Sequence, residues 1–210
     1  MGWDLFTQGG LMMYPLTVCS VLALAIAFER GFSLRRGRII RPEIVSVIEN
    51  IQGPEDIGLA LSVCKQYEGP FASVMRAGLD NRNLPIEEMR EGILDQGRQE
   101  MGSLQKGLVI LETVASVSPL LGLLGTVLGM IRVFQDVSEV GVGQGNLLAG
   151  GIAEAILTTA AGLFIAIPAL VCFNFYSNRT ETLILEIEKY ANTLLKKLRG
   201  FQDSENAEDA

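Results

Sequence analysis

The hydrophobic positions of this chain form three long, uncharged stretches, residues 5–28, 113–131 and 155–178. A helix needs about 20 apolar residues to cross the hydrocarbon core of a bilayer, and each stretch offers that length. A buried helix of a soluble protein can imitate one such stretch, but hardly three. The pattern therefore predicts an all-α integral membrane protein with three transmembrane helices.

Basic residues gather on one side of these predicted spans. Five arginines lie between residues 30 and 41, and further lysines and arginines precede the second span and follow the third. Residues 1–10 and 137–153 contain neither, and only Arg132 breaks the pattern. Because positively charged connections stay in the cytoplasm, we expect the N-terminus to lie outside, and the region 31–106 and the C-terminus to lie inside, in the cytoplasm.

The segments between the spans are expected to be helical. Prolines at 54, 70 and 85 stand where helices typically start. No proline follows Pro85 until Pro119, so one helix of roughly 75 Å is expected from there to about Gln135. After the third span, apolar residues recur at spacings of three and four, which predicts packing on the chain's own 54–106 helices or on neighbouring copies. They are Leu183, Ile187, Tyr190, Leu194, Leu198 and Phe201.

Two of the three spanning helices should thus extend into a cytoplasmic helical bundle. The expected division of the chain is an outer interfacial segment (1–10), transmembrane helices (11–30, 107–135 and 151–178), a cytoplasmic helical region (31–106), a short periplasmic loop (136–150), a cytoplasmic C-terminal helix (179–201) and a disordered acidic tail (202–210).

Composition narrows the function. The mean hydropathy is +0.32, and the net charge of −7 argues against nucleic-acid binding, which needs a basic surface. The chain contains no histidine, which excludes imidazole-based catalytic triads and the usual catalytic zinc sites. Its three cysteines show no metal-ligand spacing. We therefore expect neither an enzyme, nor a metal site, nor a cofactor.

Small residues mark the second span. Gly122, Thr126 and Gly129 share one helical face, with Pro119 and Gly125 in the same stretch. Small residues let helices approach closely in lipid, so we interpret the glycines as helix-packing positions. The hydroxyl of Thr126 either bonds back to its own helix or points into a polar lumen.

The third span starts with an ionisable group, Glu154. A carboxylate within the membrane is costly and typically functional; the alternative is an interfacial carboxylate that favours the helix N-terminus. Thr158 lies one turn further on the same face, whereas Thr159 lies with Gly162 on a neighbouring face of small residues. Pro168 is expected to kink this helix.

Three stretches of this sequence, in this order, resemble the ExbB/TolQ branch of the MotA/TolQ/ExbB proton-channel family. They are Pro15 to Arg30, PLLGLLGTVLGMI over 119–131, and IAEAILTTAAGL with its continuation to Ala169 over 152–169. The resemblance covers nearly the whole chain, and the three spans fit ExbB and TolQ better than MotA, which has four. With only a short N-terminal segment before the first span, both ExbB and TolQ stay open.

The resemblance implies a homo-oligomeric ring, a pentamer, around single-span partners of the ExbD/TolR type. It also implies a place in the bacterial inner membrane, with the N-terminus in the periplasm and the C-terminus in the cytoplasm. It also implies that an aspartate of the partner takes protons near Thr126 and Thr159, with Glu154 beside that path. Thr158 is the alternative to Thr159, because it shares the face of Glu154. A TonB- or TolA-like protein is a further partner that the resemblance allows.

The residues themselves agree with a two-component machine. Residues 113–131 and 155–178 contain no Asp, Glu, Lys, Arg or His, so this chain alone offers no proton relay across the membrane. The expected function is therefore the ring-forming subunit of a proton-driven motor. The alternatives are an autonomous channel or transporter, which typically shows internal repeats or several buried charges, and an inert scaffold, which needs no Glu154.

Overall fold

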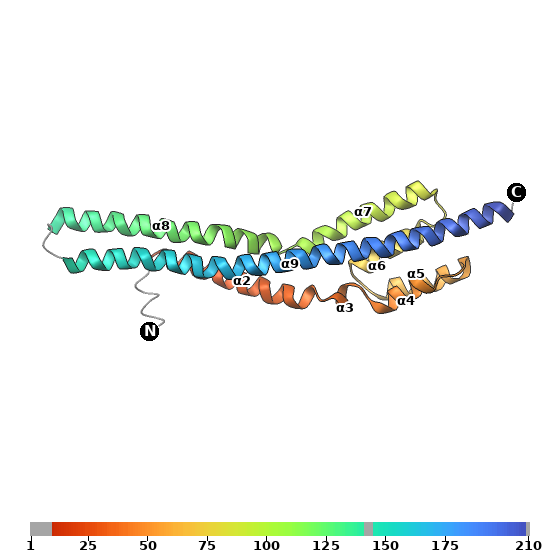
Figure 1. Cartoon of the computed structure of the whole chain (residues 1–210), viewed down its shortest axis with the longest axis horizontal. Helices are drawn as coiled ribbons and strands as arrows, with labels where there is room; N and C mark the ends of the chain where they lie inside the picture. Colours follow the sequence, from red (N-terminus) through yellow and green to blue (C-terminus); the bar gives the residue numbers. More distant parts are fainter. Residues whose placement is uncertain (1–9, 141–144, 209–210) are drawn as a thin grey trace. The chain divides into compact units, whose positions relative to one another are not determined.

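The computed structural model describes residues 10–140 and 145–208, and these residues form helices without any strand (Figure 1). The helices in chain order are α2 (Met13–Ser33), α3 (Arg36–Ile39), α4 (Pro42–Asn50), the 3-10 turn η1 (Pro54–Asp56), α5 (Ile57–Gln66), α6 (Pro70–Asp80), α7 (Ile86–Gln105), α8 (Leu108–Val140) and α9 (Gly145–Glu208).

Three helices among the described residues are long and apolar enough to cross a membrane. They cover Met13–Ser33, Leu108–Gln135 and Ala149–Ser204. This agrees with the three spans that the hydrophobic pattern predicts. The N-terminal segment before Gly10 and residues 141–144, within the expected periplasmic loop, lie outside the described residues.

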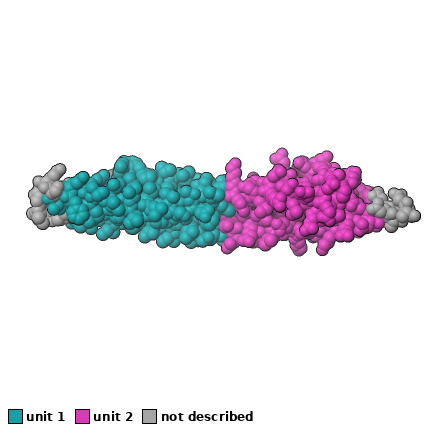
Figure 2. All heavy atoms as spheres, turned by 90° about the horizontal axis from the view of Figure 1, so that it is seen from above, with its two compact units in different colours: residues 1–30, 107–175 teal, residues 31–106, 176–210 magenta. Residues whose placement is uncertain are grey.

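The chain divides into two compact units, which Figure 2 shows in two colours. Unit 1 contains residues 1–30 and 107–175, and so most of the three apolar helices. Unit 2 contains residues 31–106 and 176–210, with the short helices α3 to α7 and the C-terminal part of α9.

Unit 2 is held together by one hydrophobic cluster. Phe71, Met75, Leu79 and Met89 of α6 and α7 are fully buried in it. The predicted apolar stripe of α9 packs here, on the chain's own helices: Leu183, Ile187, Leu194 and Leu198 are buried in the cluster, while Tyr190 and Phe201 pack against it partly exposed.

Polar contacts fix the same part of α9 to the short helices of unit 2. The Arg36 guanidinium binds both carboxylate oxygens of Glu186, with Nε 2.9 Å from Oε2. The ammonium group of Lys197 donates to the carbonyls of Glu49 and Ile51, at 2.6 and 2.8 Å. Since α4 ends at Asn50, these donors satisfy carbonyls at a helix end that lack a partner within the helix.

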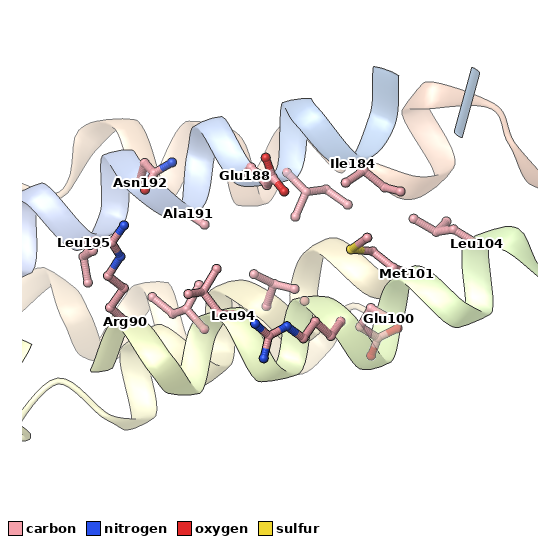
Figure 3. Close-up of a pocket in the computed structure, with 15 residues that line it drawn as sticks. Arg90, Leu94, Glu100, Met101, Leu104, Ile184, Glu188, Ala191, Asn192 and Leu195 are labelled. Carbon is pink, nitrogen blue, oxygen red and sulfur yellow. The ribbon is translucent and has the colours of Figure 1, made fainter. Parts of the chain in front are cut away.

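Unit 2 also contains a cavity of about 380 Å³ between α7 and α9 (Figure 3). Its walls are mainly apolar, with Leu94, Met101 and Leu104 from α7 and Ile184 and Leu195 from α9. Charged and polar side chains also line it: Arg90, Arg98, Glu100, Glu188 and Asn192.

The three prolines mark helix starts as predicted. Pro54 opens η1, Pro70 is the first residue of α6, and Pro85 immediately precedes α7. Proline fits a first turn because that turn leaves backbone N–H groups unpaired anyway.

The expectation of one helix from residue 85 to 135 is wrong. Helix α7 ends at Gln105 and α8 begins at Leu108. Gly107 between them has φ +86°, and a Cβ there would lie 3.1 Å from Nε of Arg30. Glycine alone adopts such a left-handed conformation without strain. Of the two apolar helices expected to continue into the cytoplasmic region, α9 runs unbroken from Gly145 to Glu208, whereas α8 is separate from α7.

The expected loop and tail are shorter than the sequence suggests. Helix α8 continues to Val140 and α9 begins at Gly145, so much of the 136–150 segment is helical rather than loop. The acidic tail, expected to be disordered from residue 202, continues α9 to Glu208. Within it, the Ser204 hydroxyl donates to the carbonyl of Gly200, and Arg199 faces Asp203 one turn on. The stretch 202–208 contains neither proline nor glycine to end the helix.

Candidate functional site

Helices α8 and α9 approach so closely within unit 1 that glycine is required at the contact. A Cβ on Gly162 would lie 2.6 Å from the carbonyl oxygen of Ser118, and one on Gly122 would lie 2.9 Å from that of Thr158. One on Gly129 would lie 3.0 Å from Cβ of Ala155. This contact between backbones is the arrangement that small residues favour in membranes.

Gly125, rather than Thr126, completes the α8 face that meets α9. A Cβ on Gly125 would lie 2.6 Å from Oγ1 of Thr158, and Gly122, Gly125 and Gly129 are all buried. Thr126 lies beside this face, half-buried, and its hydroxyl donates to the carbonyl of Leu123 in its own helix at 2.6 Å. The bond to its own helix, one of the two alternatives for this hydroxyl, is thus present in the single chain.

Thr158 and Thr159 meet α8 in different ways. Thr158 is 1% exposed, and its hydroxyl donates to the carbonyls of Ala155 and Glu154, at 2.8 and 3.1 Å. The hydroxyl of Thr159 instead crosses to α8 and donates to the carbonyl of Gly122 at 3.1 Å. These hydroxyls place polar oxygens along the contact between the helices, but a hydroxyl does not titrate at neutral pH.

Pro119 and Pro168 both stand inside helices that continue past them. Pro168 lines a cavity of about 180 Å³ in unit 1, between α2 and α9, together with Ala23, Leu24 and Phe164. Proline is tolerated within apolar helices where neighbouring groups compensate for the missing backbone donor.

Glu154 pairs with Arg132 of α8. Oε1 of Glu154 accepts a hydrogen bond from Nη1 of Arg132 at 3.0 Å, and the two side chains are 26% and 55% exposed. Gly10 packs against the same carboxylate: its φ is +63°, and any side chain there would collide with Glu154. Leu11, Met12, Gly125 and Thr158 line a small cleft next to the pair.

The pairing of Arg132 with Glu154 was not predicted from the sequence, where this arginine is the exception to the charge pattern. The positions of Arg132 and Glu154 in the sequence could have predicted the ion pair. Arg132 precedes, and Glu154 follows, the short connection between α8 and α9 by a similar number of residues. In an antiparallel helix pair, residues equally distant from the connection lie opposite each other, and opposite charges at such positions indicate an ion pair.

Taken together, this is a helical membrane protein in which a close helix pair buries threonine hydroxyls and carries an ion pair near its connected end. A sequence profile that describes the MotA/TolQ/ExbB proton channel family matches residues 66–189. The chain belongs to this family, within its ExbB/TolQ branch.

Relatives of both types in that branch are similar to the chain over most of its length. It is 36% identical to biopolymer transport protein ExbB-like 1 of Synechocystis over 81% of this chain and 68% of that protein. It is 31% identical to biopolymer transport protein exbB1 of Vibrio cholerae over 94% of this chain and 90% of that one. It is 30% identical to the Tol-Pal system protein TolQ of Pseudomonas aeruginosa over 87% and 85%.

Proposed function

We propose that this chain is the ring-forming subunit of an inner-membrane motor driven by the proton-motive force. It works with an ExbD/TolR-like single-span partner and couples proton flow to work on the periplasm or the outer membrane. A TonB- or TolA-like protein receives that work. The membrane-spanning parts are residues 11–30, 107–135 and 151–178, with the N-terminus periplasmic and residues 31–106 and 179–201 cytoplasmic.

The observation that carries this proposal is the apolar surface of unit 1. Phe28 of α2, Leu120 of α8 and Phe164, Val171 and Phe175 of α9 are each more than 60% exposed in the single chain. Soluble monomers rarely expose large side chains together on several helices. Lipid can cover one such surface, and copies of the same chain in a closed ring, a pentamer in this family branch, can cover the others.

The second support is the distribution of charge along the apolar helices. Between residues 113 and 131 and between 155 and 178 the chain contains no ionisable Asp, Glu, Lys or Arg. Thr126, Thr158 and Thr159 offer hydroxyls there, and Glu154 stands at the edge of this region. A proton carrier must bind and release a proton within the membrane field, so it must come from a partner's acidic residue.

Reconstitution in liposomes with an imposed pH gradient tests this proposal. The chain alone should form a complex of several copies, counted by native mass spectrometry, and should leave the gradient nearly intact. Addition of the ExbD/TolR-like protein of the same organism should collapse the gradient. A monomeric chain, or rapid collapse without any partner, would favour a scaffold or an autonomous channel instead.

A further inference from the structure

We propose that Arg132 is a positioning residue for Glu154: its guanidinium holds the carboxylate at the contact between α8 and α9. This inference rests on the proposed function, because it assigns Arg132 a part in proton-driven work. It concerns a residue that the family resemblance does not implicate.

The geometry of the pair is the first step. Nη1 of Arg132 lies 3.0 Å from Oε1 of Glu154, and the two residues come from different helices. Glu154 is the more enclosed partner, at 26% exposed against 55%. A hydrogen bond between two charged groups is stronger than one between neutral groups, so it can fix the rotamer of a glutamate that is otherwise long and flexible.

Within the described part of the chain, the cleft beside Glu154 offers its carboxylate few polar partners. The adjacent cleft has a volume of about 10 Å³, which is at most the space of about one water molecule. Gly10 packs directly against the carboxylate. Leu11, Leu128 and Gly129 line the cleft together with Glu154. Among the residues that line this cleft, Arg132 carries the positive charge that faces Glu154.

The position of the ion pair links the orientation of Glu154 to the proposed function. Thr158 lines the same cleft as Glu154 and is buried against Gly125. The carboxylate therefore lies in the same cleft as Thr158, one threonine of the helix contact. Without the guanidinium, the glutamate loses its partner from α8 and is free to turn toward solvent, so the charge moves away from the hydroxyls.

The test uses the full chain in liposomes together with its single-span partner, and measures partner-dependent proton flux and thermal stability of the purified complex. Arg132→Gln should lower the flux by up to about fivefold, the effect of an interaction of about 1 kcal/mol, while the complex still assembles. Arg132→Lys keeps the charge and should retain most of the flux. An unchanged flux in Arg132→Gln would overturn the proposal.

An exchange of the two charges tells whether Arg132 positions the Glu154 carboxylate or only holds α8 and α9 together. The double variant Arg132→Glu with Glu154→Arg restores an ion pair between the helices but removes the carboxylate from α9. It should regain thermal stability and remain deficient in flux. If the exchange restores flux, the pair is a structural clamp and the proposal is wrong. If the unaltered chain gives no partner-dependent flux at all, the proposed function itself fails, and this inference fails with it.

Discussion

The closest approach between α8 and α9 predicts a large effect from one added methyl group. In Gly162→Ala the new Cβ would lie 2.6 Å from the carbonyl oxygen of Ser118, 3.2 Å from Cα of Gly122 and 3.3 Å from its nitrogen. All three are backbone atoms, so no side chain can rotate out of the way. The helices must separate until the first distance reaches an ordinary contact of 3.4 Å or more.

Two contributions set the size of this effect. Overpacking a tight interface costs about 1–3 kcal/mol. The separation also stretches the 3.1 Å hydrogen bond from Thr159 to the carbonyl of Gly122, and such a bond between membrane helices contributes about 0.6 kcal/mol. The variant should therefore lose about 2–4 kcal/mol of unfolding free energy, a fall of the thermal midpoint of about 5–15 °C for a chain of this size.

Thermal unfolding of the purified chain in one detergent measures this loss, with Gly150→Ala as the matched control. Gly150 lies in the same helix, and a Cβ there meets no atom within 4 Å. The control should unfold at the temperature of the unaltered chain or slightly above it, because alanine favours a helix more than glycine. Equal midpoints for Gly162→Ala and Gly150→Ala would refute the close helix contact.

Three further predictions concern separate parts of the chain. Thr159→Val removes the hydroxyl that bonds across to α8 and should lower the free energy of unfolding by about 0.5–1 kcal/mol. Thr126→Val removes only a bond within α8 and should cost less. A larger loss in Thr126→Val than in Thr159→Val would contradict these two hydrogen bonds. Gly97→Ala should stabilise α7 by about 0.5–1 kcal/mol, because a Cβ there meets no atom within 4 Å. Gly78→Ala should destabilise the chain, because a Cβ there would lie 3.0 Å from Cδ1 of Ile93. A Gly78→Ala variant more stable than the unaltered chain would contradict this packing. Burial raises the pKa of the Cys64 thiol to about 11, so between pH 9 and 11 the folded chain keeps this proton while the unfolded chain releases it. The free energy of unfolding should therefore fall as the pH rises from about 9 to about 11. Unfolding curves measured over this pH range should lack the fall in Cys64→Ser.

The features foreseen from sequence are those that depend on a sustained pattern. The three apolar helices follow from stretches too long and too uncharged for anything but a membrane or a large core. The α9 stripe from Leu183 to Leu198 follows from helical spacing, because burying one face of a helix needs regularly spaced apolar residues.

The features that were missed depend on single residues and on tertiary contacts. The break at Gly107 has no proline to announce it, and a glycine within a helical pattern is usually tolerated. Neither its left-handed φ nor its contact with Arg30 leaves a mark in the sequence, because both arise only in the folded chain. Likewise, the choice of Gly125 over Thr126 at the helix contact depends on how α8 is rotated against α9, which periodicity alone does not determine.

The central claim is that this chain forms the housing of a proton path and that the titrating group comes from the partner. The most direct measurement compares proton flux through liposomes that contain the chain with an unaltered ExbD/TolR-like partner or with a partner whose membrane aspartate is changed to asparagine. We expect both partners to bind the chain equally, and only the unaltered one to support flux driven by a membrane potential. Undiminished flux with the asparagine partner would contradict it, because the chain itself would then carry the proton.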